Sequence, residues 1–315
     1  MNNYFKKIAK LIRTYRSESS DKVKDIFDTL PNGLTLLDIG AAGGIEPRWK
    51  NVSKYLNYIG VEPDDRSNKG LEDQQIFKSV KILNSFAWSE EKKIEFNLCR
   101  KPMVSSAYLP NRELLDQFPD SQRFDIIKKE ILQAEPLSKD GEVHNIDFIK
   151  LDIQGGELNA LKGLGDSLDN CLGMEIEIEF TEMYKSQPLF GDVHNFLSSK
   201  GFYFSDFVNL IKWERDSLEG HGRCIFGDGL WIRELRTLDL KNKETYLKYA
   251  AICSIYGKID EAMHTLQTLE EEAPKGFKNL LLKQFQQQKK EREKFKLVRK
   301  LWNLYSPRTK IQLIE

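Results

Sequence analysis

The chain has 315 residues, of which 40% are hydrophobic and 11% aromatic, so it can bury a sizeable core and is not a disordered chain. Its 48 basic residues equal its 48 acidic ones, which argues against a nucleic acid as partner, although both ends are locally basic. Four widely spaced cysteines form no zinc or disulfide pattern, and no apolar run is long enough to span a bilayer. We therefore expect a cytoplasmic protein.

Residues 1–20 form a basic segment with helical periodicity. The first 16 residues contain five lysines or arginines and no acid, and apolar side chains recur at helical spacing. This pattern suits an amphipathic helix at the inner face of a membrane. It also suits a helix packed on its own domain, with its lysines extended into solvent. We expect the second arrangement and keep peripheral membrane contact as the alternative.

A buried strand that runs into a glycine-rich turn predicts a nucleotide site. The apolar run Leu34–Leu37 is typical of a parallel strand buried on both faces. The strand ends at Asp38, and three glycines follow at once, namely Gly40, Gly43 and Gly44. Glycine lets the chain turn sharply and lets a ligand approach the backbone. Doubly wound α/β folds place their nucleotide site at such a turn, and a crossover helix is expected next, over residues 45–54.

A second strand, expected over residues 58–63, ends in an acid. Glu62 lies 22 residues after Gly40. An acid at about this distance accepts hydrogen bonds from both hydroxyls of an adenosine ribose. A solvated acid at a strand end is the alternative, and the upstream glycine turn favours the ribose contact.

The remaining pattern predicts alternating strands and helices up to residue 233. Strands are expected over 80–86, 94–98, 146–151, 173–180, 202–207, and 223–233 with an interruption at 227–229; helices are expected over 21–30, 158–164 and 193–200. Residues 99–122 lack a pattern and are interpreted as an insertion on the substrate side. Alternation in the 173–180 strand predicts that Glu175, Glu177 and Glu179 share one face.

The first glycine turn does not have the spacing of a dinucleotide fingerprint, which requires Gly-x-Gly-x-x-Gly. An acid on the strand followed by a looser glycine set, as in Asp38-Ile39-Gly40, is common in enzymes that use S-adenosylmethionine. A second motif is more specific. It reads Phe148-Ile149-Lys150-Leu151-Asp152-Ile153-Gln154-Gly155-Gly156-Glu157, with Leu161-Lys162-Gly163 after it.

This second motif resembles the hallmark of the FkbM-type methyltransferase family, in which the stretch reads much like Lys-Ile-Asp-x-Glu-Gly-x-Glu. The resemblance continues in Glu177-x-Glu179, in Pro188-Leu189-Phe190 with Asp192, and in Gly201-Phe202, and it covers roughly residues 34–233. Gln154 stands where the family usually has glutamate, and this departure weakens a catalytic role for that position.

The resemblance implies a class I α/β fold, Rossmann-like, with a seven-stranded mixed sheet and helices on both faces. It also implies S-adenosylmethionine as donor and O-methylation of a sugar or glycan intermediate of the surface polysaccharide type. Another small-molecule hydroxyl or an amine is the alternative acceptor. The expected cofactor contacts are Asp38, Gly40, Ala41, Gly43, Glu62, Pro63, Phe86, Ala87 and Asp152.

Methyl transfer to a hydroxyl needs a group that removes the proton. Asp152, at the end of a central strand, is the first candidate, followed by Glu179 and by His221 near the last strand. Asp152, Glu179 and Asp228 form an alternative oxygen ligand set for Mg²⁺ or Ca²⁺, which is not favoured. Glu157 has two interpretations of equal weight, as a group that contacts the ligands of the site or as a charge that caps its helix.

The last 79 residues have helical composition and lie outside the resemblance. Residues 246–256 and 259–269 have the pattern of a tetratricopeptide-like helix pair, and residues 283–300 that of a basic helix. A single pair cannot bury its own face, so it is expected to pack on the domain or to form a homo-oligomer. We expect three parts, residues 1–20, 21–236 and 237–315. A non-catalytic assembly module that uses the tail is the alternative to an enzyme.

Overall fold

The computed structural model describes residues 23–41, 44–63, 76–215, 222–238, 242–268, 276–287, 289–290 and 293. These residues belong to two compact units. The larger unit takes its described residues from Gly33–Ile45 and Ser53–Asp239, and the smaller one contains Glu46–Val52 with described residues from both ends of the chain. The expected N-terminal segment 1–20, Gly43 and His221 lie outside the described residues.

The larger unit contains a seven-stranded mixed sheet with the order β3-β2-β1-β7-β8-β10-β9. Its strands are β1 (Leu34–Ile39), β2 (Leu56–Val61), β3 (Ser79–Leu83), β7 (Phe148–Leu151), β8 (Gly173–Glu179), β9 (Phe202–Trp213) and β10 (Arg223–Arg233). The first five in the order run parallel, and β10 is antiparallel to both of its neighbours. The strand order reverses between β1 and β7, which is where open α/β sheets bind ligands. The expected class I fold is confirmed.

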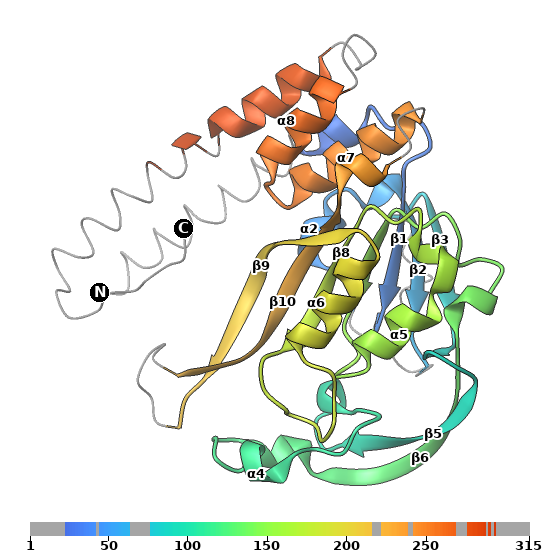
Figure 1. Cartoon of the computed structure of the whole chain (residues 1–315), viewed down its shortest axis with the longest axis vertical. Helices are drawn as coiled ribbons and strands as arrows, with labels where there is room; N and C mark the ends of the chain where they lie inside the picture. The colour runs from blue at the N-terminus through green and yellow to red at the C-terminus, as the bar shows by residue number, and fades with distance from the viewer. Residues whose placement is uncertain are drawn as a thin grey trace, which may run out of the picture. The chain divides into compact units, whose positions relative to one another are not determined.

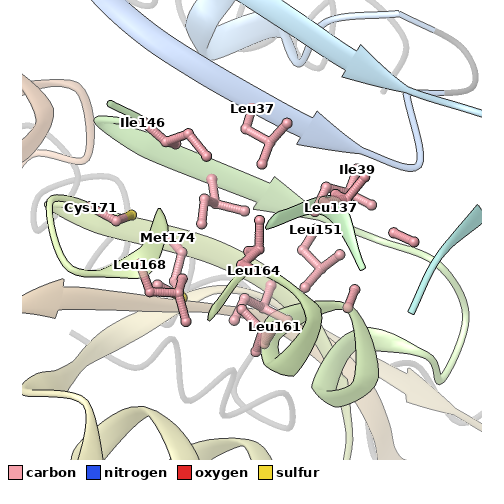
Figure 2. Close-up of a cluster of buried hydrophobic side chains, with 14 of the residues drawn as sticks. Leu37, Ile39, Leu137, Ile146, Leu151, Leu161, Leu164, Leu168, Cys171 and Met174 are labelled. Atoms are coloured by element: carbon pink, nitrogen blue, oxygen red, sulfur yellow. The ribbon is translucent and has the colours of Figure 1, made fainter. Parts of the chain in front are cut away.

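One face of the sheet packs against α5 (Glu157–Gly163) and α6 (Phe190–Ser199). Figure 2 shows side chains of β1, β7 and β8 meeting those of α5 and the segment after it. Successive side chains of a strand point to opposite faces of the sheet. Leu37 and Ile39 of β1 therefore enter this cluster, whereas Asp38 between them points to the opposite face.

A second sheet of three strands is inserted between β3 and β7. It has the order β4-β6-β5 and consists of β4 (Phe86–Ala87), β5 (Lys92–Cys99) and β6 (Ile126–Glu135). The link between β5 and β6 contains the short helix α4 (Arg112–Leu115). In Figure 1 this insertion lies beyond the arrowheads of β1 and β2, at the carboxyl edge of the main sheet. The Ser106 hydroxyl joins the two parts by donating a hydrogen bond to the Gln154 carbonyl, at 2.6 Å.

Three expectations about local structure are corrected. The helix expected over residues 45–54 is reduced to α2 (Pro47–Lys50) and a 3₁₀ turn at Ser53–Tyr55, because the Asn-Val-Ser run that follows α2 has low helix propensity. The predicted interruption at 227–229 is wrong: β10 is continuous, and its register with β9 shifts after Asp228 instead. Residues 80–86 are divided between β3 and β4, which belong to different sheets.

The smaller unit contains the expected helix pair, α7 (Lys243–Ile255) and α8 (Ile259–Thr268). The Asn242 side chain caps α7, and Gly257, with a φ of +70°, allows the turn between the helices. Residues 277–287 form a further helix, joined to α7 by a hydrogen bond of 2.9 Å from Gln284 Nε2 to the Ser254 carbonyl. No helix among the described residues is long and apolar enough to cross a membrane. Self-association through this unit stays a prediction.

Gly163, the last residue of α5, tests the packing of this helix. A Cβ atom there would lie 1.9 Å from the Trp88 carbonyl oxygen, whereas one at the exposed Gly141 would meet nothing within 4 Å. We expect Gly163→Ala to lower the free energy of unfolding by about 3 kcal/mol, since a backbone clash outweighs the gain of about 1 kcal/mol in helix propensity. Gly141→Ala is the control. Equal denaturation midpoints for both variants would contradict this packing.

Candidate active site

The turn after β1 is held against the ends of both neighbouring strands. The N–H groups of Gly40 and Ala41 donate to the Val61 carbonyl at the end of β2, at 2.9 and 3.3 Å. On the other side, the Asp152 N–H donates to the Ile39 carbonyl at 3.0 Å. Gly40 has a φ of +86°, and a Cβ there would lie 2.0 Å from the Asp152 carbonyl oxygen. Only glycine allows this turn to approach the second motif so closely.

Two buried acids lie at the ends of β1 and β2. Asp38 is the penultimate residue of β1, and its Oδ2 accepts a hydrogen bond from the Tyr58 hydroxyl at 2.8 Å. Burial and the Asp38 charge raise the pKa of Tyr58 well above its ordinary value, so the phenol stays a donor. Glu62 directly follows β2, is buried, and its N–H donates to the Leu83 carbonyl at the end of β3. Pro63 comes next.

The second motif forms a tight loop between β7 and α5. Gln154 and Gly155 both have left-handed backbones, with φ of +59° and +98°. The Glu157 carboxylate closes the loop by accepting the Ile153 N–H at 2.8 Å. Burial, partly offset by backbone hydrogen bonds, raises the pKa of Glu157 to about 7. This contact favours a structural role for Glu157, as a hydrogen-bond acceptor of the loop rather than as a charge that stabilises α5.

Four side chains of this region form a polar network at the carboxyl ends of β7 and β8. Gln154 Nε2 donates to Asp152 Oδ1 at 3.1 Å and to Glu177 Oε1 at 2.5 Å. The Tyr184 hydroxyl lies 3.1 Å from Gln154 Oε1. Asp152 is half-buried, whereas Glu177 is buried. Asp152 therefore combines a fixed orientation with access from solvent.

Glu179, the last residue of β8, is buried, and its Oε1 atom has no hydrogen-bond partner among the described residues. Burial and then the Glu157 charge raise the pKa of Glu179 well above its ordinary value, although the Gln187 amide opposes this shift. The pKa of Glu177 is also raised well above its ordinary value, first by burial and then by the Asp152 and Glu179 charges. The predicted shared face of Glu175, Glu177 and Glu179 thus lies inside the protein, and all three are buried.

Lys150 supplies positive charge at the centre of these acids. Strand register places it between Asp38 of β1 and Glu175 of β8, and its Nζ lies 3.5 Å from Asp152 Oδ2. Burial alone lowers the pKa of Lys150, but the nearby carboxylates, chiefly Asp152 and Asp38, raise it above its ordinary value. The lysine therefore stays charged and balances part of the negative charge.

The alternative metal ligand set is not assembled as a metal site among the described residues. Asp228 lies opposite Glu177 in the β8–β10 pairing, whereas Glu179 lies opposite Phe226. Within the part of the chain that the structure describes, no group of three or more His, Cys, Asp or Glu side chains could hold a metal ion. The alternative ligand set Asp152, Glu179 and Asp228 therefore has no support in the geometry.

The structure places Phe86 and Ala87 in the second sheet, where they form β4 and pair with β6. The Phe86 ring contacts Phe96 and Trp88, and Ala87 is buried in the main core. These contacts show how both residues pack, and their expected contact with the cofactor stays a prediction. Gly43 and His221 lie outside the described residues, so the structure does not place them.

Sequence reasoning did not assign roles to Lys150, Tyr58 or Tyr184. Lys150 carried a signal, because a lysine between Ile149 and Leu151 in a buried strand needs a buried partner. Tyr58 also alternates with apolar residues on its strand, but a tyrosine there is equally suited to a core. Tyr184 comes from a loop far along the chain, and its contact with Gln154 depends on the fold.

The fold and the acids at its carboxyl edge define a class I methyltransferase that depends on S-adenosylmethionine. Residues 38–204 match the family model described as the methyltransferase FkbM domain, a match that spans more than half of the chain. The chain belongs to this family, and the resemblance stated from the second motif is confirmed. No curated protein matches the chain by sequence.

Solved structures with a similar fold include other methyltransferases. Magnesium protoporphyrin IX methyltransferase from Synechocystis PCC 6803, with bound SAM, is 11% identical over 71% of this chain and 82% of its own, with a TM-score of 0.37. Precorrin-6y C5,15-methyltransferase from Geobacter metallireducens GS-15 is 12% identical over 69% and 88%, with a TM-score of 0.33. M. capricolum TrmK, in complex with S-adenosylhomocysteine, is 10% identical over 85% and 95%, with a TM-score of 0.33.

The raised pKa of Glu157 predicts a pH dependence of stability. A carboxyl group whose pKa rises from 4.5 to about 7 on folding contributes stability that is lost as the pH rises through this window. Glu157→Gln keeps an oxygen that can accept the Ile153 N–H, so we expect it to be more stable than wild type at pH 8 by about 3 kcal/mol. This difference should shrink towards pH 5.

Chemical denaturation of both proteins between pH 5 and pH 8 measures this difference. Glu113→Gln is the control, because Glu113 also lies in the first turn of a helix but is exposed. A stability difference between Glu157→Gln and wild type that stays constant over this pH range would show that the folded-state pKa of Glu157 is not raised.

Proposed function

We propose that this methyltransferase transfers a methyl group from S-adenosylmethionine to a hydroxyl of a sugar or glycan intermediate. The observation that carries the proposal is the position of Asp152. It is half-buried at the carboxyl end of β7, its two carboxylate oxygens are held by Gln154 and Lys150, and its backbone touches the Gly40 turn. A reacting hydroxyl needs such a group within reach of the donor site.

The residues at the ends of β1 and β2 suit the donor. The glycine at position 40 lets the turn lie against the end of β7, which leaves the edge of the sheet between β1 and β7 to the ligand. Asp38 would accept hydrogen bonds from the donor's amino group, and Glu62 from its ribose hydroxyls. When bound, S-adenosylmethionine supplies an electrophilic methyl group on a sulfonium.

The acids at the end of β7 and β8 suit a hydroxyl acceptor, with two different roles. Asp152, paired with Lys150 and open to solvent, would take the hydroxyl proton and pass it to water as the new C–O bond forms. Glu179, whose raised pKa favours the protonated form, would donate a hydrogen bond to a neighbouring hydroxyl of the acceptor.

The negative charge of this edge also bears on the acceptor. Asp152, Glu177 and Asp228 lie close together, and the nearby Lys150 already contacts Asp152. A phosphate next to the reacting hydroxyl would be repelled by these groups. A neutral polyhydroxyl ring, which can both donate to carboxylates and accept from Glu179, fits the edge better.

Donor binding tests the first part of the proposal. We expect Asp38→Ala and Glu62→Ala each to weaken S-adenosylmethionine binding at least tenfold in calorimetry, because each removes a charge-assisted hydrogen bond worth about 1.5–3 kcal/mol. Glu62→Gln, which keeps one acceptor oxygen, should weaken binding less than Glu62→Ala. Circular dichroism confirms that the variants fold. Wild-type affinity in both alanine variants would refute the assigned donor site.

The acceptor is tested with a panel of neutral sugars, phosphorylated sugars and amines, with product detection by mass. We expect a gain of one methyl on a neutral sugar hydroxyl and at least a hundredfold loss of this rate in Asp152→Asn. Asp166→Asn, at an exposed aspartate of the same unit, is the control. Methylation of amines alone, or full activity in Asp152→Asn, would contradict the proposal.

A further inference from the structure

Gln154 occupies an unusual backbone position for a residue other than glycine. Its φ of +59° lies in the left-handed region, which costs free energy for a residue with a side chain. The hydrogen bond from the Ser106 hydroxyl to its carbonyl holds the peptide in place. Because a distant segment holds this residue in a strained conformation, the direction of its side chain is set by the surrounding structure.

The side-chain amide of Gln154 makes contacts that define its orientation. Its Nε2 atom faces two carboxylates, those of Asp152 at 3.1 Å and Glu177 at 2.5 Å, and its Oε1 atom faces the Tyr184 hydroxyl. An NH₂ group has two hydrogens and serves both carboxylates at once. The reverse orientation would bring the amide oxygen against the Asp152 carboxylate and would turn the NH₂ group towards the Tyr184 hydroxyl.

The network continues from Gln154 into the insertion. The Tyr184 hydroxyl lies 3.0 Å from the Val104 carbonyl as well as 3.1 Å from Gln154 Oε1. The Ser106 hydroxyl, besides its bond to Gln154, accepts the Tyr108 N–H at 3.0 Å. The single hydroxyl hydrogen of Tyr184 can donate to either of these two oxygens, so the Gln154 backbone is bonded to Ser106 directly and its side chain lies next to residue 104 through Tyr184.

A glutamate at this position could not make the same contacts while ionised. It would add a negative charge to a region that already holds Asp152, Glu157, Glu177 and Glu179. A protonated glutamate has a single O–H and could serve only one of the two carboxylates. A glutamine at this position is therefore a neutral double donor, a role that glutamate in either protonation state could not fill.

We propose that Gln154 is a positioning residue: its amide orients the Asp152 carboxylate towards the acceptor and links it, through Tyr184 and Ser106, to the inserted residues 104–108. This inference rests on the role proposed above for Asp152. The groups around the amide that carry or change charge are Lys150 of β7, Asp152 directly after this strand, Glu157 of α5, Glu177 and Glu179 of β8, Asp228 of β10, Tyr184, and Cys99 of β5 near Tyr184.

The test compares Gln154→Glu, Gln154→Met and the control Gln133→Glu, an exposed glutamine on β6. The first readout is the melting temperature of the full chain between pH 5.5 and pH 8.5. A glutamate at position 154 has a folded-state pKa raised by the neighbouring acids, so its stability is lost as the pH rises. We expect a deficit in Gln154→Glu that grows steeply with pH, a deficit in Gln154→Met that grows less because no acid is added and only a donor to two acids is lost, and no deficit in Gln133→Glu.

The second readout separates positioning from general stability. With the acceptor found by the panel, we expect kcat to fall about tenfold or more in Gln154→Met while KM for S-adenosylmethionine stays within twofold of wild type. In Gln154→Glu, kcat should recover at low pH relative to Gln154→Met, because the protonated acid regains one donor.

The outcomes distinguish this inference from the proposed function. Unchanged kcat in both variants, or a melting deficit in Gln154→Glu that is the same at every pH, would overturn the role of Gln154. If no acceptor of the panel is methylated, the proposed function fails. The role of Gln154 is then still decided by two measurements, the pH dependence of melting and the affinity for S-adenosylmethionine in calorimetry.

Discussion

The close approach of Gly40 to the Asp152 carbonyl is the constraint on which the rest of the site depends. Because no Cβ separates them, the turn after β1 lies directly against the end of β7, and the Asp152 N–H reaches the Ile39 carbonyl. The donor motif and the second motif, more than 100 residues apart in the sequence, thereby share one edge of the sheet. The acids of both motifs come together as a consequence of backbone contact.

Such a concentration of acids needs compensation, and the structure provides it in three ways. Lys150 gives positive charge where the strand register brings Asp38 and Glu175 beside it. Hydrogen bonds from neutral groups, such as the Tyr58 hydroxyl and the Gln154 amide, stabilise carboxylates without adding charge. Where neither is sufficient, as at Glu179, the pKa rises and the group favours its neutral form. The methyl donor, a sulfonium, fits an environment of this kind.

Much of this arrangement could be predicted from the sequence because it follows from local pattern. Apolar runs ending in Asp38, Glu62 and Asp152 identify parallel strands and the edge at which their acids meet. The alternation of Glu175, Glu177 and Glu179 correctly predicts a shared face. Hydrophobic pattern could not show that this face is buried, because that depends on what covers it.

The parts that the sequence did not reveal depend on tertiary contacts. Gln154 was expected to have a weakened role, since only its chemical type was visible; its three side-chain contacts come from β7, β8 and a later loop. The three-stranded insertion was expected only in part, as a strand over residues 94–98 followed by an irregular segment. Its assembly into a separate sheet was not visible, because β6 pairs with β4 and β5 across distant segments. The helix expected over residues 45–54 is short because the low helix propensity of the Asn-Val-Ser run after α2 outweighs the helical pattern.

The central claim is that the ends of β1, β2 and β7 form one site for an adenosyl ligand and its acceptor. A crystal structure of the protein with S-adenosylhomocysteine tests it most directly. The account predicts density for the ligand along the Gly40 turn, with Asp38 and Glu62 within hydrogen-bond distance and the sulfur facing Asp152. Ligand density at any other place, with Asp38 and Glu62 making no contact to it, would contradict the account.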